Sequence, residues 1–152
     1  MPRGLPHLRS VVNRLLSRQG CPWDREQTHK SLIVYLREET LELEQALAGG
    51  RWHEIEDELG DLLFHIFFHS KIAEKAGHFG VDEVAESQAL KLKRRHPHVF
   101  GRSRVFKDGR EVSQNWKTIK AAERELRRRD VKKRAAGRKK RKEGARDVLR
   151  RT

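Results

Sequence analysis

Cysteine is almost absent: the chain has one, Cys21, so it can form no disulfide bond within itself. A lone cysteine is typical of proteins in a reducing compartment. No run of sequence approaches the roughly 20 apolar residues that a transmembrane helix needs, which argues against a membrane protein. Residues 1–7 lead into no apolar segment of the kind that forms the centre of a signal peptide. We therefore expect a cytoplasmic protein.

Apolar residues are also scarce, at 36% of the 152 residues against 38% charged residues. This leaves a thin core for one domain and favours helices that bury a face against a partner subunit. The charge is concentrated at one end, because residues 124–152 contain 15 Lys and Arg against 4 Asp and Glu. That segment accounts for +11 of the chain's net +13. The sequence thus predicts a near-neutral domain over residues 1–125 and a basic, flexible tail over residues 126–152.

Helical periodicity dominates the first 125 residues, and no alternating strand pattern occurs. The spacing predicts five helices, at about residues 5–17, 28–49, 52–76, 81–95 and 113–129. The segment Gln19–Asp24 ends the first helix, and either Thr28 or Ser31 is a candidate N-cap of the second. Gly77 is a natural residue to follow the third helix, and we interpret residues 96–112 as a loop. The expected fold class is all-α, an antiparallel four-helix bundle with an extra C-terminal helix and the basic tail.

Two clusters of acids carry the most specific signal, and together they comprise five carboxylates: Glu38, Glu39, Glu42, Glu58 and Asp61. On helices, Glu39 with Glu42 and Glu58 with Asp61 are i,i+3 pairs that share a face. If the two helices fold back antiparallel about the glycine turn between them, Glu42 faces Glu58 and Glu39 faces Asp61. Like charges do not gather in a partly dry groove without a cation. The pattern therefore indicates a divalent-metal site.

Mg²⁺ prefers oxygen ligands in octahedral geometry, and four carboxylates can hold two such ions with positions left for a polyphosphate. Ions of this kind orient water and stabilise the charge that develops on a phosphoryl group. The pattern thus favours metal-assisted hydrolysis or transfer at a phosphate. The alternative is that the acids are solvated helix faces paired with Lys and Arg, and the pattern alone leaves both interpretations open.

His65 and His69 follow Asp61 at helical spacing and offer a second metal hypothesis. A histidine pair at i,i+4 with carboxylates can bind zinc or iron. The neighbouring residues Phe64, Phe67 and Phe68 favour histidines that are hydrogen-bonded within the core. We take the core interpretation as the stronger of the two.

A triphosphate also needs cations from the protein. Lys91 and Arg95 are one helical turn apart, as are Trp116 and Lys120. The cations can bind phosphate while Trp116 stacks on a base or sugar. The alternatives are a match to the helix dipole for Lys91 and Arg95 and a core role for Trp116. We interpret Trp23 as a packing anchor.

Together these motifs resemble the MazG family of nucleoside triphosphate pyrophosphohydrolases over roughly residues 5–125. Five strings carry the resemblance: Gly20-Cys21-Pro22-Trp23-Asp24, Glu38-Glu39-x-x-Glu42, Glu58-Leu59-Gly60-Asp61, Arg94-Arg95-His96-Pro97-His98-Val99-Phe100 and Asn115-Trp116-Lys117-x-Ile119-Lys120. The E-E-x-x-E and E-x-x-D pair is the metal signature of that family.

The resemblance implies an all-α fold that forms a homodimer or tetramer. It implies Mg²⁺, or Mn²⁺ in its place, on four ligands: Glu39, Glu42, Glu58 and Asp61. Glu38 would lie beside them as an outer group or helper base. The implied reaction splits a nucleoside triphosphate between its α and β phosphates into a nucleoside monophosphate and pyrophosphate, which is a house-cleaning of nucleotide pools. Four residues match nucleotide-contacting positions: Lys91, Arg95, Trp116 and Lys120.

The competing interpretation is a binding module rather than an active enzyme. A catalytically weak domain would sense nucleotides, or would associate with nucleic acid through residues 126–152. The charge of that tail would contact phosphates without reading sequence. The alternative for the tail is an extension that keeps the protein in solution or adheres to ribosomes, and the sequence leaves both interpretations open.

Overall fold

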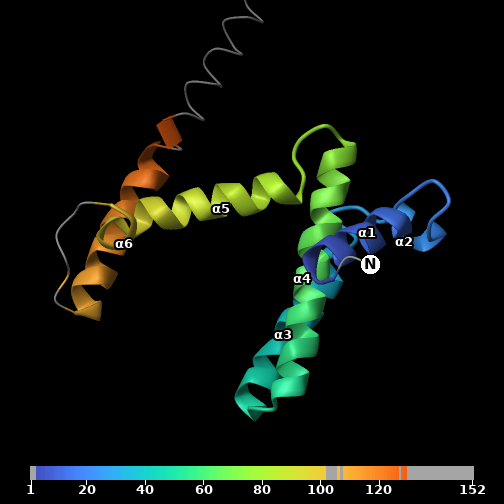
Figure 1. Ribbon diagram of the computed structural model, residues 1–152, viewed down its shortest axis with the longest axis horizontal. Coiled ribbons are helices and arrows are strands. Elements are labelled where there is room, and N and C mark those ends of the chain that lie inside the picture. The colour runs from blue at the N-terminus through green and yellow to red at the C-terminus, as the bar shows by residue number, and fades with distance from the viewer. Residues whose placement is uncertain (1–2, 102–105, 107, 127, 130–152) are drawn as a thin grey trace, which may run out of the picture. The chain divides into compact units, whose positions relative to one another are not determined.

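The computed structural model describes residues 3–101, 106, 108–126 and 128–129. These residues form helices and no strand, which confirms the all-α class (Figure 1). The chain divides into two compact units, Met1–Ala89 and Leu90–Thr152. No helix in the described ranges has both the length and the apolar composition needed to cross a bilayer.

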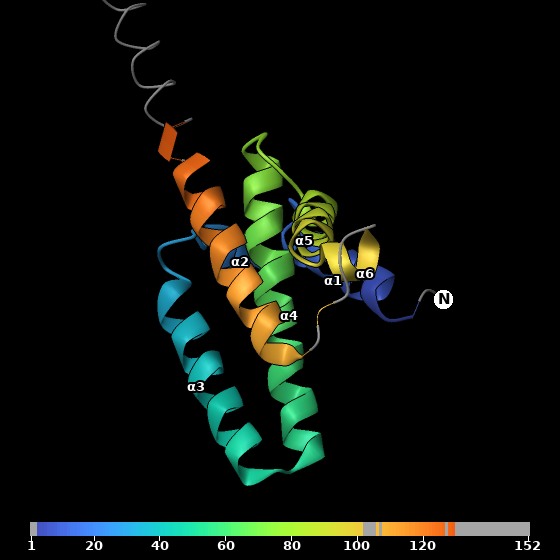
Figure 2. The same cartoon turned by 90° about the vertical axis from the view of Figure 1, so that its left-hand side faces the viewer.

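The first unit is built on an antiparallel hairpin of α3, Ile33–Gly49, and α4, Trp52–Lys75 (Figures 1 and 2). The turn between them depends on Gly50, which follows α3 with a φ of 69°, in the left-handed region that favours glycine. Ala46 and Ile55 are buried on either side of this turn. The hairpin is the arrangement that the glycine signal predicted.

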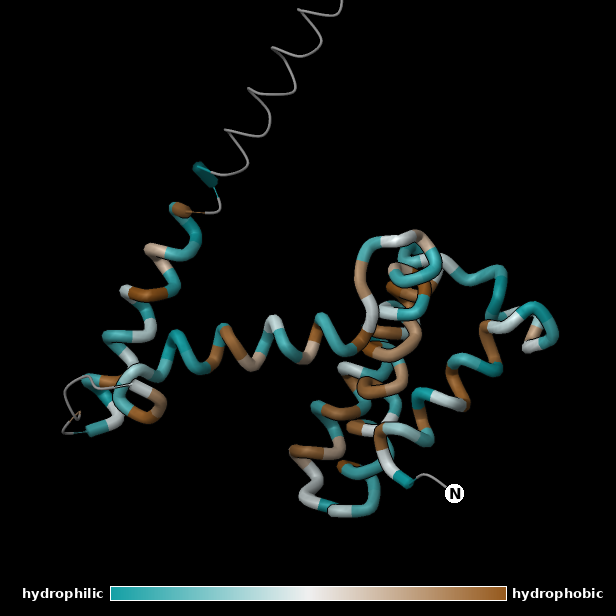
Figure 3. Tube along the Cα trace, turned by 45° about the horizontal axis from the view of Figure 1, so that its top comes forward, coloured by the Kyte–Doolittle hydropathy of each residue, from teal (hydrophilic) through white to brown (hydrophobic). Residues whose placement is uncertain are grey.

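The core of this unit forms where α1, Leu5–Leu15, packs against α4. Five buried side chains make up the core: Val12, Leu16, Leu32, Phe67 and Phe68. Lys75 Nζ also donates to the carbonyl oxygen of Leu16 and fastens the end of α4 to the segment after α1. Apolar residues recur at intervals among hydrophilic ones along the helices, as expected for helices with one buried face (Figure 3).

The connection from α1 to α3 differs from the prediction. The segment expected only to interrupt the helices contains a short helix, α2, Pro22–Glu26, because Pro22 occupies its first turn, where proline is compatible with a helix. Neither Thr28 nor Ser31 is the N-cap of α3; that residue is Leu32. Instead, Thr28 N–H donates to Ser31 Oγ at 2.9 Å and Ser31 N–H donates to Thr28 Oγ1 at 3.1 Å. The two side chains therefore close the turn before α3.

The remaining helices are α5, Val81–Arg95, α6, Pro97–Phe100, and a helix over residues 109–126. The bounds of α5 confirm the prediction, whereas the expected loop contains α6. The last helix begins before residue 113 because Asp108 Oδ1 accepts the N–H groups of Arg110 and Glu111 at 2.9 and 3.0 Å. Nearly all of the predicted tail, residues 126–152, lies outside the described residues. The boundary at residue 125 therefore stays a prediction.

Gly20 and Gly60 make a matched test of packing in the first unit. A Cβ on Gly20 would lie 2.0 Å from the carbonyl oxygen of Leu15, whereas a Cβ on Gly60 would meet nothing within 4 Å. We expect Gly20→Ala to lower the free energy of unfolding by about 1–3 kcal/mol because the backbone must shift. Gly60→Ala should raise it by about 0.5–1 kcal/mol, since alanine favours the helix interior. Chemical denaturation measures both, and equal effects of the two substitutions would contradict this packing.

Candidate functional site

Three of the predicted acids meet on the α3–α4 hairpin. Glu39 of α3 and Glu58 and Asp61 of α4 each offer a carboxylate oxygen, and these atoms all lie within 4.8 Å of one another. Glu39 and Glu58 are half-buried and Asp61 is exposed. The i,i+3 spacing places Glu58 and Asp61 on one face of α4, and the hairpin brings Glu39 to them. The arrangement is a cluster of oxygen donors open to solvent on one side.

Burial, together with the crowding of negative charge, raises the pKa of Glu39 and of Glu58 above the usual carboxylate value. For Glu39 the main cause is burial, followed by the charges of Asp61, Glu42, Glu58 and Glu38. For Glu58 the main cause is again burial, followed by Glu42 and Asp61. Glu58 Oε2 is buried and has no hydrogen-bond partner among the described residues. A carboxylate oxygen in that position is costly unless a cation binds it.

Glu42 and Glu38 are both exposed, and neither belongs to the group of three. The charge of Glu42 nevertheless reaches both Glu39 and Glu58 and raises the pKa of each. The charge of Glu38 raises the pKa of Glu39 but is not among the causes of the raised pKa of Glu58. The hairpin thus gathers three of the four predicted ligands closely and leaves Glu42 near them.

The chemistry of this donor set fits a hard divalent cation. Carboxylate oxygens suit Mg²⁺, Mn²⁺ and Ca²⁺, whereas zinc and iron sites usually include nitrogen or sulfur ligands. Among the described residues, no group of three metal-capable side chains includes a histidine. The histidine-containing alternative therefore gains no support.

His65 is a core residue, as predicted, with 5% of its surface exposed. Burial lowers its pKa, which the charge of Asp61 partly opposes. The prediction that it would be hydrogen-bonded is wrong at one atom, because Nδ1 has no hydrogen-bond partner in the part of the chain that the structure describes. His65 therefore packs in the core and does not belong to the group of three acids.

His29 makes a contact that the sequence did not suggest. Its Nδ1 lies 2.9 Å from Nδ1 of His69, with the two rings within 10° of parallel. One imidazole must donate and the other accept, so the two rings adopt complementary proton positions. The contact ties the connection before α3 to α4. No local pattern could have found it, because residues 29 and 69 meet only once the chain folds.

A hollow of about 390 Å³ in the first unit lies elsewhere, between α1, the end of α4 and the start of α5. Four of its charged lining residues form two ion pairs, Arg9 with Asp82 at 2.5 Å and Lys71 with Glu74 at 3.0 Å, and Glu83 accepts the N–H of Gly80 at 3.0 Å. None of the five predicted acids lines it. Four of its charged residues are thus engaged with one another, and it contains none of the residues that the sequence predicted for catalysis.

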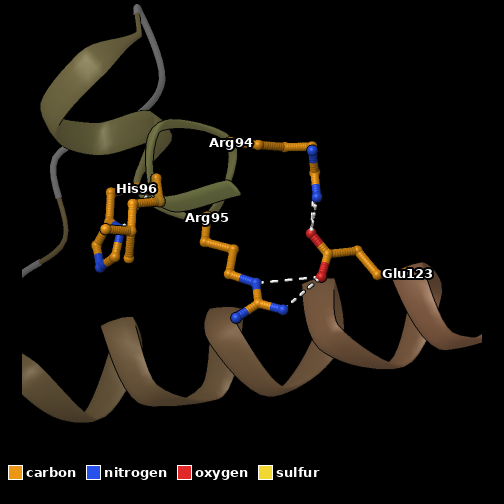
Figure 4. Close-up of polar contacts among 5 residues, drawn as sticks. Arg94, Arg95, His96 and Glu123 are labelled. Carbon is orange, nitrogen blue, oxygen red and sulfur yellow. Dashed lines mark hydrogen bonds and ion pairs between the residues drawn. The ribbon is translucent and has the colours of Figure 1, made fainter. Parts of the chain in front are cut away.

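The predicted nucleotide-binding residues belong to the second unit, and an ion-pair cluster dominates them. Arg94 and Arg95 both donate to the carboxylate of Glu123 (Figure 4). Arg95 uses Nε and Nη2 at 3.1 and 2.6 Å on Oε2, and Arg94 uses the same two atoms at 2.9 and 2.5 Å on Oε1. These bonds lower the pKa of Glu123 to about 2. The Nε–Nη2 edge of Arg95 is therefore already occupied by a carboxylate.

Trp116 and Lys120 line a separate hollow of about 390 Å³ in this unit, and both are half-buried, as is Lys91. The Arg95 guanidinium carbon lies 5.8 Å from the centre of the Trp116 ring, and His96 meets that ring edge to face at 5.0 Å. Sequence reasoning missed Glu123. Its spacing of three residues from Lys120 and seven from Trp116, which places it on their face of the helix, was the available signal.

The family is decided by a direct match: residues 27–100 fit the family model described as the MazG nucleotide pyrophosphohydrolase domain. The chain belongs to the MazG family. The matched MazG segment contains all five predicted acids together with Lys91 and Arg95, and it ends before Trp116.

Curated relatives of this MazG chain are longer proteins. The nucleoside triphosphate pyrophosphohydrolase/pyrophosphatase MazG of Thermotoga maritima is 42% identical over 114 residues, which cover 75% of this chain and 43% of the relative. The uncharacterized protein YabN of Bacillus subtilis is 42% identical over 115 residues, covering 76% and 23% respectively. The chain thus spans less than half the length of these relatives.

A solved structure agrees with the MazG fold. The crystal structure of a MazG-related protein from Thermotoga maritima superposes with a TM-score of 0.63 at 21% sequence identity. The superposition covers 77% of this chain and 99% of that one. At this identity the likeness supports the fold alone.

The raised pKa values of Glu39 and Glu58 predict how stability depends on pH. The folded MazG domain keeps protons that the unfolded chain has already lost, so stability falls as pH rises from the usual carboxylate pKa through the raised values. At neutral pH a bound cation replaces those protons, and we expect MgCl₂ or MnCl₂ to raise the melting temperature. Glu58→Gln should raise the melting temperature without cation and shrink the increase that cation produces.

Glu56→Gln is the matched control, because Glu56 is exposed on the same helix and outside the acid cluster. It should leave both quantities near the values of the parent protein. Thermal unfolding with and without the metal salt measures the difference. An equal cation effect in Glu58→Gln and the parent would show that Glu58 does not hold the ion.

Proposed function

We propose that this protein hydrolyses nucleoside triphosphates to nucleoside monophosphates and pyrophosphate, with Mg²⁺ or Mn²⁺ held by the acid cluster. The observation that carries the proposal is the meeting of Glu39, Glu58 and Asp61, with Glu58 Oε2 buried and without a partner among the described residues. Membership of the MazG family, and a relative named as a nucleoside triphosphate pyrophosphohydrolase/pyrophosphatase, support the reaction class. A role in cleaning cytoplasmic nucleotide pools fits this reaction.

In this proposal the acids of the hairpin hold the cations in place. Glu39, Glu58 and Asp61 supply the main ligands, and Glu42 completes the set from the next turn of α3. When bound, the cations supply positive charge that offsets the carboxylates and the phosphates of the substrate. Glu38 stays exposed beside Glu39 and is the candidate to accept a proton from the attacking water. No covalent intermediate with the protein is required.

In this proposal the second group of residues holds the nucleotide: Lys91, Trp116 and Lys120 contact it, and Arg95 lies against Trp116. The hollow lined by Trp116 and Lys120 supports this assignment, because it joins an aromatic surface to a cation. Lysine ammonium groups bind phosphate oxygens, and an indole ring stacks on a base or sugar.

We also propose that the protein acts as a homodimer or a larger assembly of identical chains. On α4, Trp52, Leu59 and Ile66 recur every seven residues and are 83%, 52% and 47% exposed. On α3, Val34 and Leu41 have the same spacing and are 61% and 54% exposed. Stripes of this spacing pack against helices of a second copy. The small core of the described residues leaves this apolar surface to be buried by a partner.

The competing role, a nucleotide sensor or a nucleic-acid-associated module, keeps the same nucleotide site without turnover. Its tail, residues 126–152, lies almost wholly outside the described residues. Contact of this tail with nucleic acid remains a prediction from its charge alone.

Pyrophosphate release from a panel of nucleoside triphosphates tests the activity directly. We expect Asp61→Asn and Glu39→Gln to lower the rate by at least about a hundredfold, because each removes a charge that holds the cation. Glu56→Gln should keep the rate of the parent. Full activity in Asp61→Asn would refute the ligand assignment, and no release by the parent with any nucleotide would favour the sensor.

The subunit proposal is tested by substitution in the apolar stripes. Leu41→Arg should place a charge in the interface and shift the protein toward monomers in sedimentation velocity. Leu5→Arg is the control, since Leu5 is 57% exposed at the start of α1 and outside both stripes. A parent that is already monomeric at working concentration would contradict the proposal.

A further inference from the structure

We infer that Glu123 positions Trp116 through Arg95, so that Arg95 supports an aromatic surface for the nucleoside and does not bind phosphate. The inference deepens the proposed function and rests on it, because it assumes that the hollow beside Trp116 receives the nucleotide. It assigns Glu123 a role as a positioning residue. It also changes the role that the sequence pattern predicted for Arg95.

The first observation is that the Nε–Nη2 edge of Arg95, one of its two anion-binding edges, is already occupied. Its Nε and Nη2 atoms both donate to Glu123 Oε2, and the same carboxylate accepts two further bonds from Arg94. Carboxylate and phosphate compete for this edge because both match the planar fork of a guanidinium. A phosphate that bound there would have to displace Glu123.

The second observation is the burial of this contact. The side chains of Arg95 and Glu123 are only 15% and 12% exposed, whereas Arg94 is 56% exposed. Separating a well-bonded ion pair in such a place leaves a buried charge without a partner, which is strongly unfavourable. Arg95 is therefore held in one orientation, and the more exposed Arg94 balances the remaining charge of the carboxylate.

The third observation is what the fixed Arg95 touches. Its guanidinium carbon lies 5.8 Å from the centre of the Trp116 ring, within the range of a cation–π contact. His96 meets the same ring edge to face at 5.0 Å. With two neighbours holding it, the indole also lines the hollow of about 390 Å³. It can therefore present an aromatic surface there in a fixed position.

The fourth observation is that two lysines, rather than Arg95, line the hollow beside Trp116. Lys117 and Lys120 both line it, together with Val112 and Ser113. An aromatic wall with nearby ammonium groups suits a nucleoside whose phosphate extends toward the lysines. Phosphate binding thus does not require Arg95.

The test compares binding of the two parts of the substrate. A Trp23→Phe, Trp52→Phe background leaves Trp116 as the only fluorescent indole, so its emission reports binding of the four ribonucleosides. Calorimetry with inorganic pyrophosphate and Mg²⁺ measures phosphate binding. In Glu123→Gln and in Arg95→Lys we expect nucleoside binding to weaken roughly tenfold, within the range of a lost stacking contact, with pyrophosphate binding no weaker than in the parent.

Glu125→Gln is the matched control, because Glu125 lies on the same helix, is exposed and forms its ion pair with Arg129 at 3.2 Å. Trp116→Leu has no reporter indole, so its nucleoside affinity is measured by inhibition of steady-state pyrophosphate release. It should show the same loss of nucleoside affinity, while pyrophosphate binding no weaker than in the parent shows that each variant is still folded. Weaker pyrophosphate binding in Arg95→Lys, or unchanged nucleoside binding in Glu123→Gln, would overturn the inference. A parent that binds both ligands but releases no pyrophosphate would refute only the proposed hydrolysis.

Discussion

Repulsion among carboxylates at the α3–α4 hairpin is the constraint on which the rest of the site depends. The turn at Gly50 fixes the register of the two helices, and that register places Glu39 against Glu58 and Asp61. Burial and mutual charge raise the pKa of two of the three acids. The packing of α3 on α4 has to hold the hairpin closed against this repulsion, and a divalent cation would remove the repulsion. Stability and metal binding are therefore coupled in the first unit.

In the second unit, by contrast, the clustered charges are of opposite sign and are paired with one another. Glu123 already balances Arg94 and Arg95 within the chain, so the ion pair needs no ligand. The bonds from both arginines lower the pKa of Glu123 to about 2. The stability that the ion pair contributes is therefore complete above the usual carboxylate pKa and is lost only as the pH falls toward 2. A paired cation beside Trp116 supports an aromatic ring better than it attracts a phosphate. An unsatisfied acid cluster and a satisfied ion pair thus indicate different roles, one for binding a cation and one for holding a neighbouring side chain.

The sequence predicted those features that depend on local spacing. The helical periodicity, the glycine turn and the i,i+3 pairs were sufficient to bring three acids together. The prediction failed where a segment has two possible local roles: residues 19–24 were expected only to interrupt the helices, but Pro22 begins α2. It also failed where the partner is distant in the chain, as for His29 with His69 and for Glu123 with two arginines. Such contacts are decided by tertiary packing, which periodicity does not encode.

The central claim is that the hairpin acids bind a divalent cation, and paramagnetic resonance of Mn²⁺ titrated into the full chain tests it most directly. The free-ion signal should fall as the protein is added, and Mg²⁺ should restore it by competition. A variant with Glu39→Gln, Glu58→Gln and Asp61→Asn together should leave the free-ion signal unchanged while remaining folded. Equal loss of signal in the parent and this variant would contradict the account.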